Sequence, residues 1–202
     1  MRLAACLLIA LLGFAQFTAI ASAEDVVIHA GRLLDQPGKP ARGPSTIVIK
    51  DGRIVSIAGG IDAAPRGAKV IDLRSRFVLP GLIDSHVHLT SDKAGVEAQL
   101  RSVTESVATN AYEAAANARK TLEAGFTTVR NLGDRDGVTL ALRDAIADGK
   151  IVGPRILDAG MSISATSGHM DPTLGFRDEL AGALDVHENL CDGVESCRRA
   201  VR

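Results

Sequence analysis

The chain has 202 residues, of which 46% are hydrophobic and 23% are charged, and its formal net charge is −1. This balance is typical of a soluble globular protein and argues against a nucleic-acid-binding protein, which usually carries a basic excess. Only 3% of the residues are aromatic and none is tryptophan. We therefore expect a core of alanine, valine, isoleucine and leucine.

The first residues have the pattern of a secretory signal peptide. Met1-Arg2 gives a short basic start, and residues 3–20 are apolar apart from one glutamine and one threonine. Ala21-Ser-Ala23 then matches the small-x-small cleavage pattern. We expect residues 1–23 to be removed, which predicts a periplasmic or secreted protein without a stable membrane anchor. An uncleaved anchor is the alternative, because the apolar run is nearly long enough to span a bilayer.

Residues 24–80 have the pattern of a small β domain. Short runs rich in β-branched residues alternate with turn-forming residues, and Asp51-Gly52 is a strong hairpin signal. The predicted strands are Val26–Ile28, Ser45–Lys50, Arg53–Ile57, Lys69–Leu73 and Arg76–Leu79. The region has no cluster of histidine or cysteine, so we interpret it as structural.

After Pro80-Gly81 the pattern changes to alternating strands and amphipathic helices. The predicted elements are a strand at residues 82–89, a helix capped by Asn110 and ending near Gly125, a strand Thr127–Leu132, a helix Val138–Asp148, a strand Arg155–Ala159, a polar loop at 164–171 and a helix from Asp192. Such alternation predicts parallel βαβ units. Residues 81–202 would form roughly half of a (β/α)8 barrel, which needs about 250 residues. A smaller, complete doubly wound sheet is the alternative.

The motif Asp84-Ser-His-Val-His88 carries the strongest chemical signal in the chain. Side chains in a strand alternate between its two faces, so we expect Asp84, His86 and His88 to share one face. The opposite, apolar face is expected to hold Ile83, Val87 and Leu89. Neutral imidazole nitrogen is a good ligand for zinc and similar divalent metals. For the motif taken alone, a strand with two satisfied histidines and no metal is the alternative.

The stretch from Val78 to Leu89, placed after a small β domain, resembles the amidohydrolase superfamily. Further segments resemble its branch of imidazolonepropionase-like proteins and Xaa-Pro or Xaa-Arg/Lys dipeptidases: Glu123–Arg130, Gly153–Arg155, Thr166–His169 and Cys191–Gly193. The resemblance covers essentially all of the mature chain. It implies an α/β protein that is the truncated N-terminal part of a metal-dependent-hydrolase (β/α)8 TIM barrel, preceded by a small β-sandwich domain.

The resemblance also implies a site for one or two zinc or other divalent metal ions at the C-terminal mouth of the barrel. His86 and His88 would be its two ligands from the first strand. The family's remaining ligands, a carboxylated lysine, two histidines and an aspartate, would lie beyond Arg202. We therefore expect no catalytic residue within the chain, and no activity of the 202-residue chain alone. In the complete enzyme the metal would lower the pKa of bound water and polarise the scissile carbonyl.

Other residues are candidates for supporting roles. We predict that Asp84 orients the metal-ligand region, with a carboxylate bonded to the backbone as the alternative. His169 lies in the loop after the third barrel strand, on the face that carries barrel active sites, and the resemblance implies substrate binding; a solvated loop histidine is the alternative. Arg130 and Asn131 end the second strand at the same mouth and could also meet substrate, with a salt-bridged arginine as the alternative.

The two cysteines of the mature chain, Cys191 and Cys197, allow either a disulfide or free thiols, because the rise of a helix makes the distance between them marginal.

The function predicted from these features is metal-dependent hydrolysis of amide C–N bonds. Dipeptidase activity is favoured over cyclic-amide opening of the imidazolonepropionase type because of the signal peptide and the Cys191 region. A non-catalytic exported binding protein of the same fold is the alternative from another class. The expected partner is a small molecule or dipeptide and not a nucleic acid, and a homo-oligomer is left open.

Overall fold

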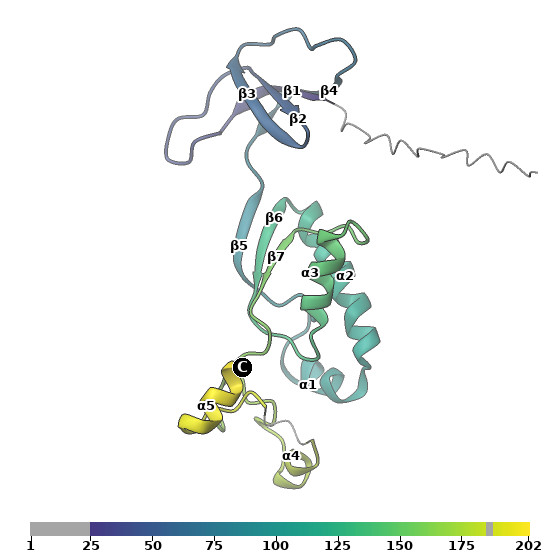
Figure 1. Cartoon of the computed structure of the whole chain (residues 1–202), viewed down its shortest axis with the longest axis vertical. Coiled ribbons are helices and arrows are strands. Elements are labelled where there is room, and N and C mark those ends of the chain that lie inside the picture. Colours follow the sequence, from purple (N-terminus) through teal and green to yellow (C-terminus); the bar gives the residue numbers. More distant parts are fainter. Residues whose placement is uncertain (1–24, 185–187) are drawn as a thin grey trace, which may run out of the picture. The chain divides into compact units, whose positions relative to one another are not determined.

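The computed structural model describes residues 25–184 and 188–202. They divide after Pro80 into two compact units, each built around its own sheet (Figure 1). The chain is a mixed α/β protein, as predicted. The expected signal peptide, residues 1–23, lies outside the described residues. Within the described ranges, no helix is long and apolar enough to cross a bilayer.

The first unit contains a four-stranded sheet in the order β3-β2-β1-β4. Its strands are β1 (Val26–Leu33), β2 (Ser45–Lys50), β3 (Arg53–Gly59) and β4 (Lys69–Val78). The predicted hairpin joins β2 to β3, and Asp51 and Gly52 adopt positive φ angles of 49° and 71° in its turn. From residue 25 onward this unit forms one sheet, so the predicted sandwich stays a prediction.

Two of the predicted short strands are a single strand, β4. Its pairing with β1 passes from Leu73 opposite Ala30 directly to Phe77 opposite Arg32. The intervening residues 74–76 bulge out of the ladder, and the strand continues beyond them. The prediction of separate strands at 69–73 and 76–79 was therefore wrong, because the bulge looks like a strand break in the sequence.

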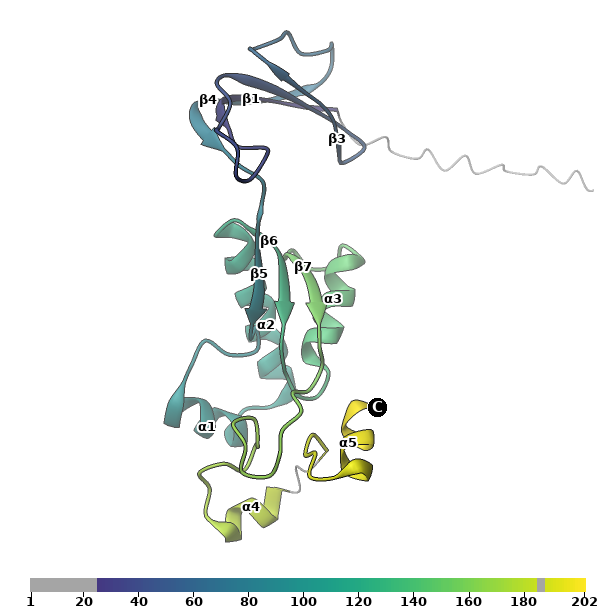
Figure 2. The same ribbon diagram turned by 90° about the vertical axis from the view of Figure 1, so that its left-hand side faces the viewer.

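The second unit contains a parallel three-stranded sheet in the order β5-β6-β7. Its elements are β5 (Leu82–Val87), α1 (Gly95–Thr104), α2 (Val107–Glu123), β6 (Phe126–Asn131), α3 (Val138–Ala147), β7 (Arg155–Asp158), α4 (Asp178–Leu184) and α5 (Val194–Val201). Helices α2 and α3 cover one face of this sheet (Figures 1 and 2). The core between them contains Leu89, Ala114, Ala118, Val129, Val138, Leu142 and Ile156.

The helices differ from the prediction in two respects. α2 begins at Val107, because the hydroxyl of Ser106 accepts a hydrogen bond from the backbone N–H of Thr109 at 3.2 Å and caps the helix. Asn110, the predicted cap, lies within the first turn. α1 and α4 were not predicted. α1 buries no residue, although Val96, Leu100 and Val103 recur in it at helical spacing and the sequence argument overlooked them.

Cys191 and Cys197 form a disulfide with 4.2 Å between their Cα atoms. Cys191 lies before α5, and its N–H donates to the Ser164 carbonyl at 2.7 Å. The chain then turns at Gly193, and α5 begins at Val194. The distance that the sequence left as marginal is therefore short enough, and of the two alternatives the structure shows the disulfide.

Candidate metal centre

The pairing of β5 with β6 contains a bulge within the motif, between Asp84 and Val87. Asp84 pairs with Val129 and Val87 pairs with Asn131, so β5 advances by three residues where β6 advances by two. The extra residue exchanges the faces taken by the side chains that follow. Asp84 therefore lies on the helix-covered face of the sheet, beside the buried Val129.

His86 and His88 lie on the open face. Val87 packs against the core of the unit, and strand alternation places its two neighbours on the opposite side. The prediction that Asp84 shares a face with both histidines was therefore wrong. The grouping of Ile83 with Val87 was wrong for the same reason, since Ile83 is 72% exposed.

Asp84 contributes to the site through the main chain. Its carboxylate accepts a hydrogen bond from the backbone N–H of His86 at 3.0 Å. This bond spans the bulge and stabilises the path of the chain into the motif. Of the two roles considered for Asp84, the structure shows the bond to the backbone.

The two imidazole rings lie next to each other on the open face. Their centroids are 5.3 Å apart and their planes meet at 68°, and both residues are exposed. His88 Nδ1 lies 3.3 Å from the carbonyl oxygen of Gly133. Because a carbonyl only accepts, Nδ1 carries the proton of the neutral ring, and Nε2 keeps a free lone pair for a metal.

This pair fits part of a zinc site. Two neighbouring imidazoles, one of them oriented by a carbonyl acceptor, match the usual donor atoms and outer partners of zinc. Within residues 25–184 and 188–202, however, no three or more His, Cys, Asp or Glu side chains converge in a way that could hold a metal ion. This part of the chain supplies two ligands and not a complete ligand set.

A buried polar network joins the carboxyl ends of the strands behind the histidines. Asn131 Nδ2 donates to Thr139 Oγ1 and to Asp158 Oδ1, each at 3.0 Å, and the Thr139 hydroxyl donates to Asp158 Oδ2 at 2.9 Å. Asn131 and Thr139 are fully buried, so Asn131 is not available to contact substrate as considered from the sequence. Arg130 donates from Nε to the Ser85 carbonyl at 2.9 Å.

Asp134 is attached to the same network. Its Oδ2 accepts the backbone N–H of Thr139 at 2.7 Å, whereas the buried Oδ1 has no hydrogen-bond partner among the described residues. Burial, which disfavours the charged form, raises the pKa of the Asp134 carboxyl; the hydrogen bond from Thr139 opposes this shift, and the charge of Asp158 adds to it.

The raised pKa of Asp134 predicts a pH-dependent stability. The folded-state pKa lies above the unfolded value, so stability from this group is greatest at low pH and is lost as pH rises through the folded-state pKa. We expect the unfolding free energy of Asp134→Asn, measured by urea denaturation, to rise relative to that of wild type as pH increases from 4 to 7. The exposed Asp62→Asn in the first unit is the control, because its charge is not among those that shift the pKa of Asp134. Identical pH profiles for wild type and Asp134→Asn would contradict the expectation.

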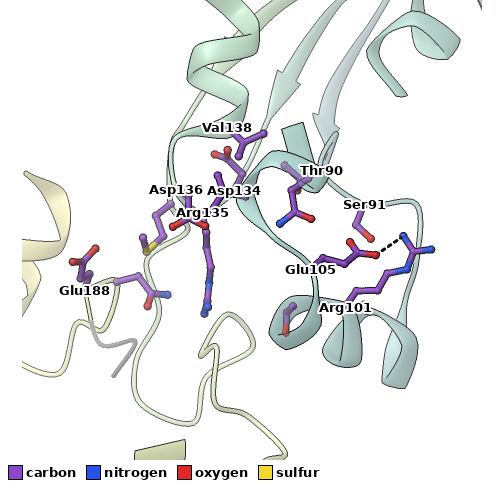
Figure 3. Close-up of a pocket in the computed structure, with 15 residues that line it drawn as sticks. Thr90, Ser91, Arg101, Glu105, Asp134, Arg135, Asp136, Val138 and Glu188 are labelled. Atoms are coloured by element: carbon purple, nitrogen blue, oxygen red, sulfur yellow. Dashed lines mark ion pairs between the residues drawn. The ribbon is translucent and has the colours of Figure 1, made fainter. Parts of the chain in front are cut away.

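A pocket of about 530 Å³ lies at the carboxyl ends of the strands (Figure 3). Its wall includes polar residues from the segment after β5, from α1 and from the loop before α3: Thr90, Ser91, Arg101, Glu105, Asp134, Arg135 and Asp136. Its volume is in the range of small-molecule sites. His86, His88 and His169 are not among the residues that line it.

His169 is exposed in the loop after β7. The loop is tied down by Asp192, which accepts hydrogen bonds from the N–H and hydroxyl of Thr166 at 2.7 and 2.6 Å. In the part of the chain that the structure describes, no hydrogen bond, ion pair or ring contact joins His169 to the histidine pair. Its role in substrate binding stays a prediction.

A model of the amidohydrolase family matches residues 77–202. The match covers more than half of the chain and includes both the histidine motif and the parallel sheet. The chain belongs to the amidohydrolase family. The resemblance inferred from the motif is thereby confirmed at the level of the family.

The named relatives of this chain carry several different activities. Ochratoxinase from Aspergillus niger is 30% identical over 193 residues, covering 89% of this chain and 39% of the relative. Dihydroorotase from Anaeromyxobacter dehalogenans (strain 2CP-C) is 35% identical over 135 residues, covering 67% and 27%. The crystal structure of a Xaa-Pro dipeptidase with bound methionine in the active site is similar with a TM-score of 0.75 and 34% identity, covering 89% and 44%. The chain thus spans less than half the length of these relatives.

Sequence reasoning missed two residues that support the motif, the buried Thr139 and the half-buried Asp158, and misjudged Asn131. One signal was available. Asn131 and Asp158 both end predicted parallel strands, and the carboxyl ends of such strands meet at one edge of the sheet. Two polar residues at that edge could have been expected to contact each other.

Proposed function

We propose that this chain is the N-terminal part of a metal-dependent amidohydrolase that hydrolyses amide C–N bonds. The observation that carries the proposal is the imidazole pair, with centroids 5.3 Å apart on the open face of a parallel sheet. His86 and His88 would hold zinc. Zinc supplies Lewis-acid activation of water and of an amide carbonyl. Membership of the family and the hydrolases among its relatives support this assignment.

The proposed architecture is the beginning of a (β/α)8 barrel. In this proposal β5, β6 and β7 are its first three strands, and the open face of their sheet faces the barrel interior. Support comes from the parallel strand order and from helices α2 and α3 on only one face. The histidines then lie where barrel enzymes carry their active sites, at the carboxyl ends of the strands.

The proposed substrates are dipeptides, and His169 is the proposed substrate-binding residue. Similarity to the Xaa-Pro dipeptidase over 89% of this chain supports the choice of substrate class.

The proposed location is periplasmic or secreted. The disulfide between Cys191 and Cys197 supports it, because such bonds persist mainly in oxidising compartments.

The test is a hydrolysis assay on the protein as its source cells make it. After removal of metal with a chelator, the protein is restored with Zn²⁺ and offered Xaa-Pro and Xaa-Arg dipeptides and a cyclic amide. We expect dipeptide hydrolysis that disappears with the metal and returns with zinc. Absence of any hydrolysis after restoration would overturn the proposed function, and hydrolysis of the cyclic amide alone would overturn the dipeptidase assignment.

A further inference from the structure

Residues 131–133, here called the anchor segment, contact residues 87–89 one by one. The three contacts are Leu89 N–H to Asn131 Oδ1 at 3.0 Å, Leu132 N–H to the Val87 carbonyl at 3.1 Å, and His88 Nδ1–H to the Gly133 carbonyl at 3.3 Å. His88 is therefore held through its own ring and through the main chain on both sides. Ordinary pairing between strands bonds the main chain alone, so it would not fix the ring of His88 together with its two neighbours.

The chain just after His88 is fixed from a second direction. Asn117 in α2 donates from Nδ2 to the carbonyl of Leu89 at 3.0 Å. Both main-chain polar groups of Leu89 are thus bound by asparagine side chains. Leu89 is itself 3% exposed and belongs to the core. Hydrogen bonds and packing together hold the main chain at Leu89 in one conformation.

Asn131 suits this position because its amide combines an acceptor with two donors. The Leu89 N–H requires the acceptor, and the carboxylate of Asp158 together with the Thr139 hydroxyl takes both donors. Only one orientation of the amide satisfies all three bonds. Aspartate would lose the donors, and leucine would lose all three bonds. The complete satisfaction of a fully buried amide makes Asn131 a rigid support.

Gly133 is restricted at the other end of the anchor segment. Its φ angle is +137°, and a Cβ at this position would collide with the Ser162 hydroxyl. That hydroxyl is not free to swing aside at no cost, since it donates to the Leu132 carbonyl at 2.8 Å. A side chain at residue 133 would therefore displace the carbonyl that His88 contacts.

We propose that the anchor segment sets the tautomer and the metal-binding orientation of His88, with Asn131 as its buried positioning residue. This inference rests on the proposed role of His86 and His88 as metal ligands. Asn131 acts through the main chain of Leu89 and through the strand end that carries Gly133. Partners that orient a ligating histidine typically contribute about 10–100-fold to metal affinity.

The test combines two measurements on this chain and its Asn131→Ala variant. Zinc affinity is measured by isothermal titration calorimetry with Zn²⁺ alone. The tautomer of His88 is measured without metal, from ¹⁵N NMR shifts of its ring nitrogens at pH 8. We expect Asn131→Ala to lower zinc affinity by about tenfold and to shift His88 from the Nδ1–H toward the Nε2–H tautomer.

Thr46→Val is the control, because Thr46 is a buried residue of the first unit whose hydroxyl makes two hydrogen bonds; its zinc affinity and His88 tautomer should match wild type. If circular dichroism shows that Asn131→Ala does not fold, Gly133→Ala replaces it with the same expected shifts. A folded variant with unchanged zinc affinity and tautomer would overturn the inference. A wild-type chain that binds no zinc would overturn the proposed metal role. In that case the tautomer measured without metal would still test whether the anchor segment orients His88, and an unchanged tautomer in Asn131→Ala would overturn that orientation.

Discussion

Replacement of both His86 and His88 by alanine should lower zinc affinity by much more than about 100-fold. Loss of an outer hydrogen-bond partner alone is expected to lower it by roughly 100-fold at most. The described residues hold no group of three or more converging His, Cys, Asp or Glu side chains, so the double variant keeps no site of that kind there. Both histidines are exposed, and the free energy of unfolding should change by no more than about 0.5 kcal/mol. Calorimetric titration with Zn²⁺ and urea denaturation measure the two quantities.

His169→Ala is the matched control for this experiment. His169 is an exposed histidine of the same unit, in the loop after β7, and its replacement should leave zinc affinity at the wild-type value. Equal zinc affinity in wild type and the double variant would rule out the β5 site. Loss of affinity in His169→Ala as well would show that the ligand set extends to that loop.

Asn131→Asp should lower the free energy of unfolding of the second unit at neutral pH by about 3–5 kcal/mol, the usual result of leaving a buried charge without a partner. The substitution preserves shape but replaces the donor that lies 3.0 Å from the Asp158 carboxylate with a second negative charge. Burial and that neighbour would raise the pKa of the introduced carboxyl. The loss of stability should therefore grow as pH rises from 5 to 8.

Urea denaturation followed by circular dichroism at both pH values measures this effect. Asn110→Asp is the control, because Asn110 is only partly buried near the start of α2, where a negative charge interacts favourably with the helix dipole. Its unfolding free energy should stay within about 0.5 kcal/mol of wild type. An equally small, pH-independent change in Asn131→Asp would contradict the central place of Asn131 in the buried network.

The regular elements of the second unit could be predicted closely where burial and periodicity coincide. β6 and β7 begin or end within one residue of the prediction, and α3 starts at Val138 as expected. α1 was missed although Val96, Leu100 and Val103 recur at helical spacing, and these side chains are exposed and not packed in the core. It is held instead by ion pairs from Arg101, including one to Glu113 at 3.0 Å, and such a partner depends on tertiary structure.

The candidate site, too, could be predicted from the sequence only in part. His86 and His88 were visible because they are close in sequence and their residue type indicates metal binding. The network behind them joins Asn131 to Asp158, which are 27 residues apart, and only the parallel pairing of β6 with β7 brings them together. The bulge at the motif was also invisible, since a single extra residue leaves the hydrophobic pattern of a short strand almost unchanged.

That bulge also determines which contacts of the motif depend on the length of the strand. With Ser85 deleted, β5 would advance by two residues where β6 advances by two, and Val87 would still pair with Asn131. Strand alternation would then keep His86 and His88 on the open face and Asp84 on the opposite face. Asp84 would directly precede His86, however, and the hydrogen bond from the His86 N–H to its carboxylate, which spans two residues, would be lost. The extra residue is therefore needed for the support that Asp84 gives to the motif, and not for the side of the sheet on which the two imidazoles lie.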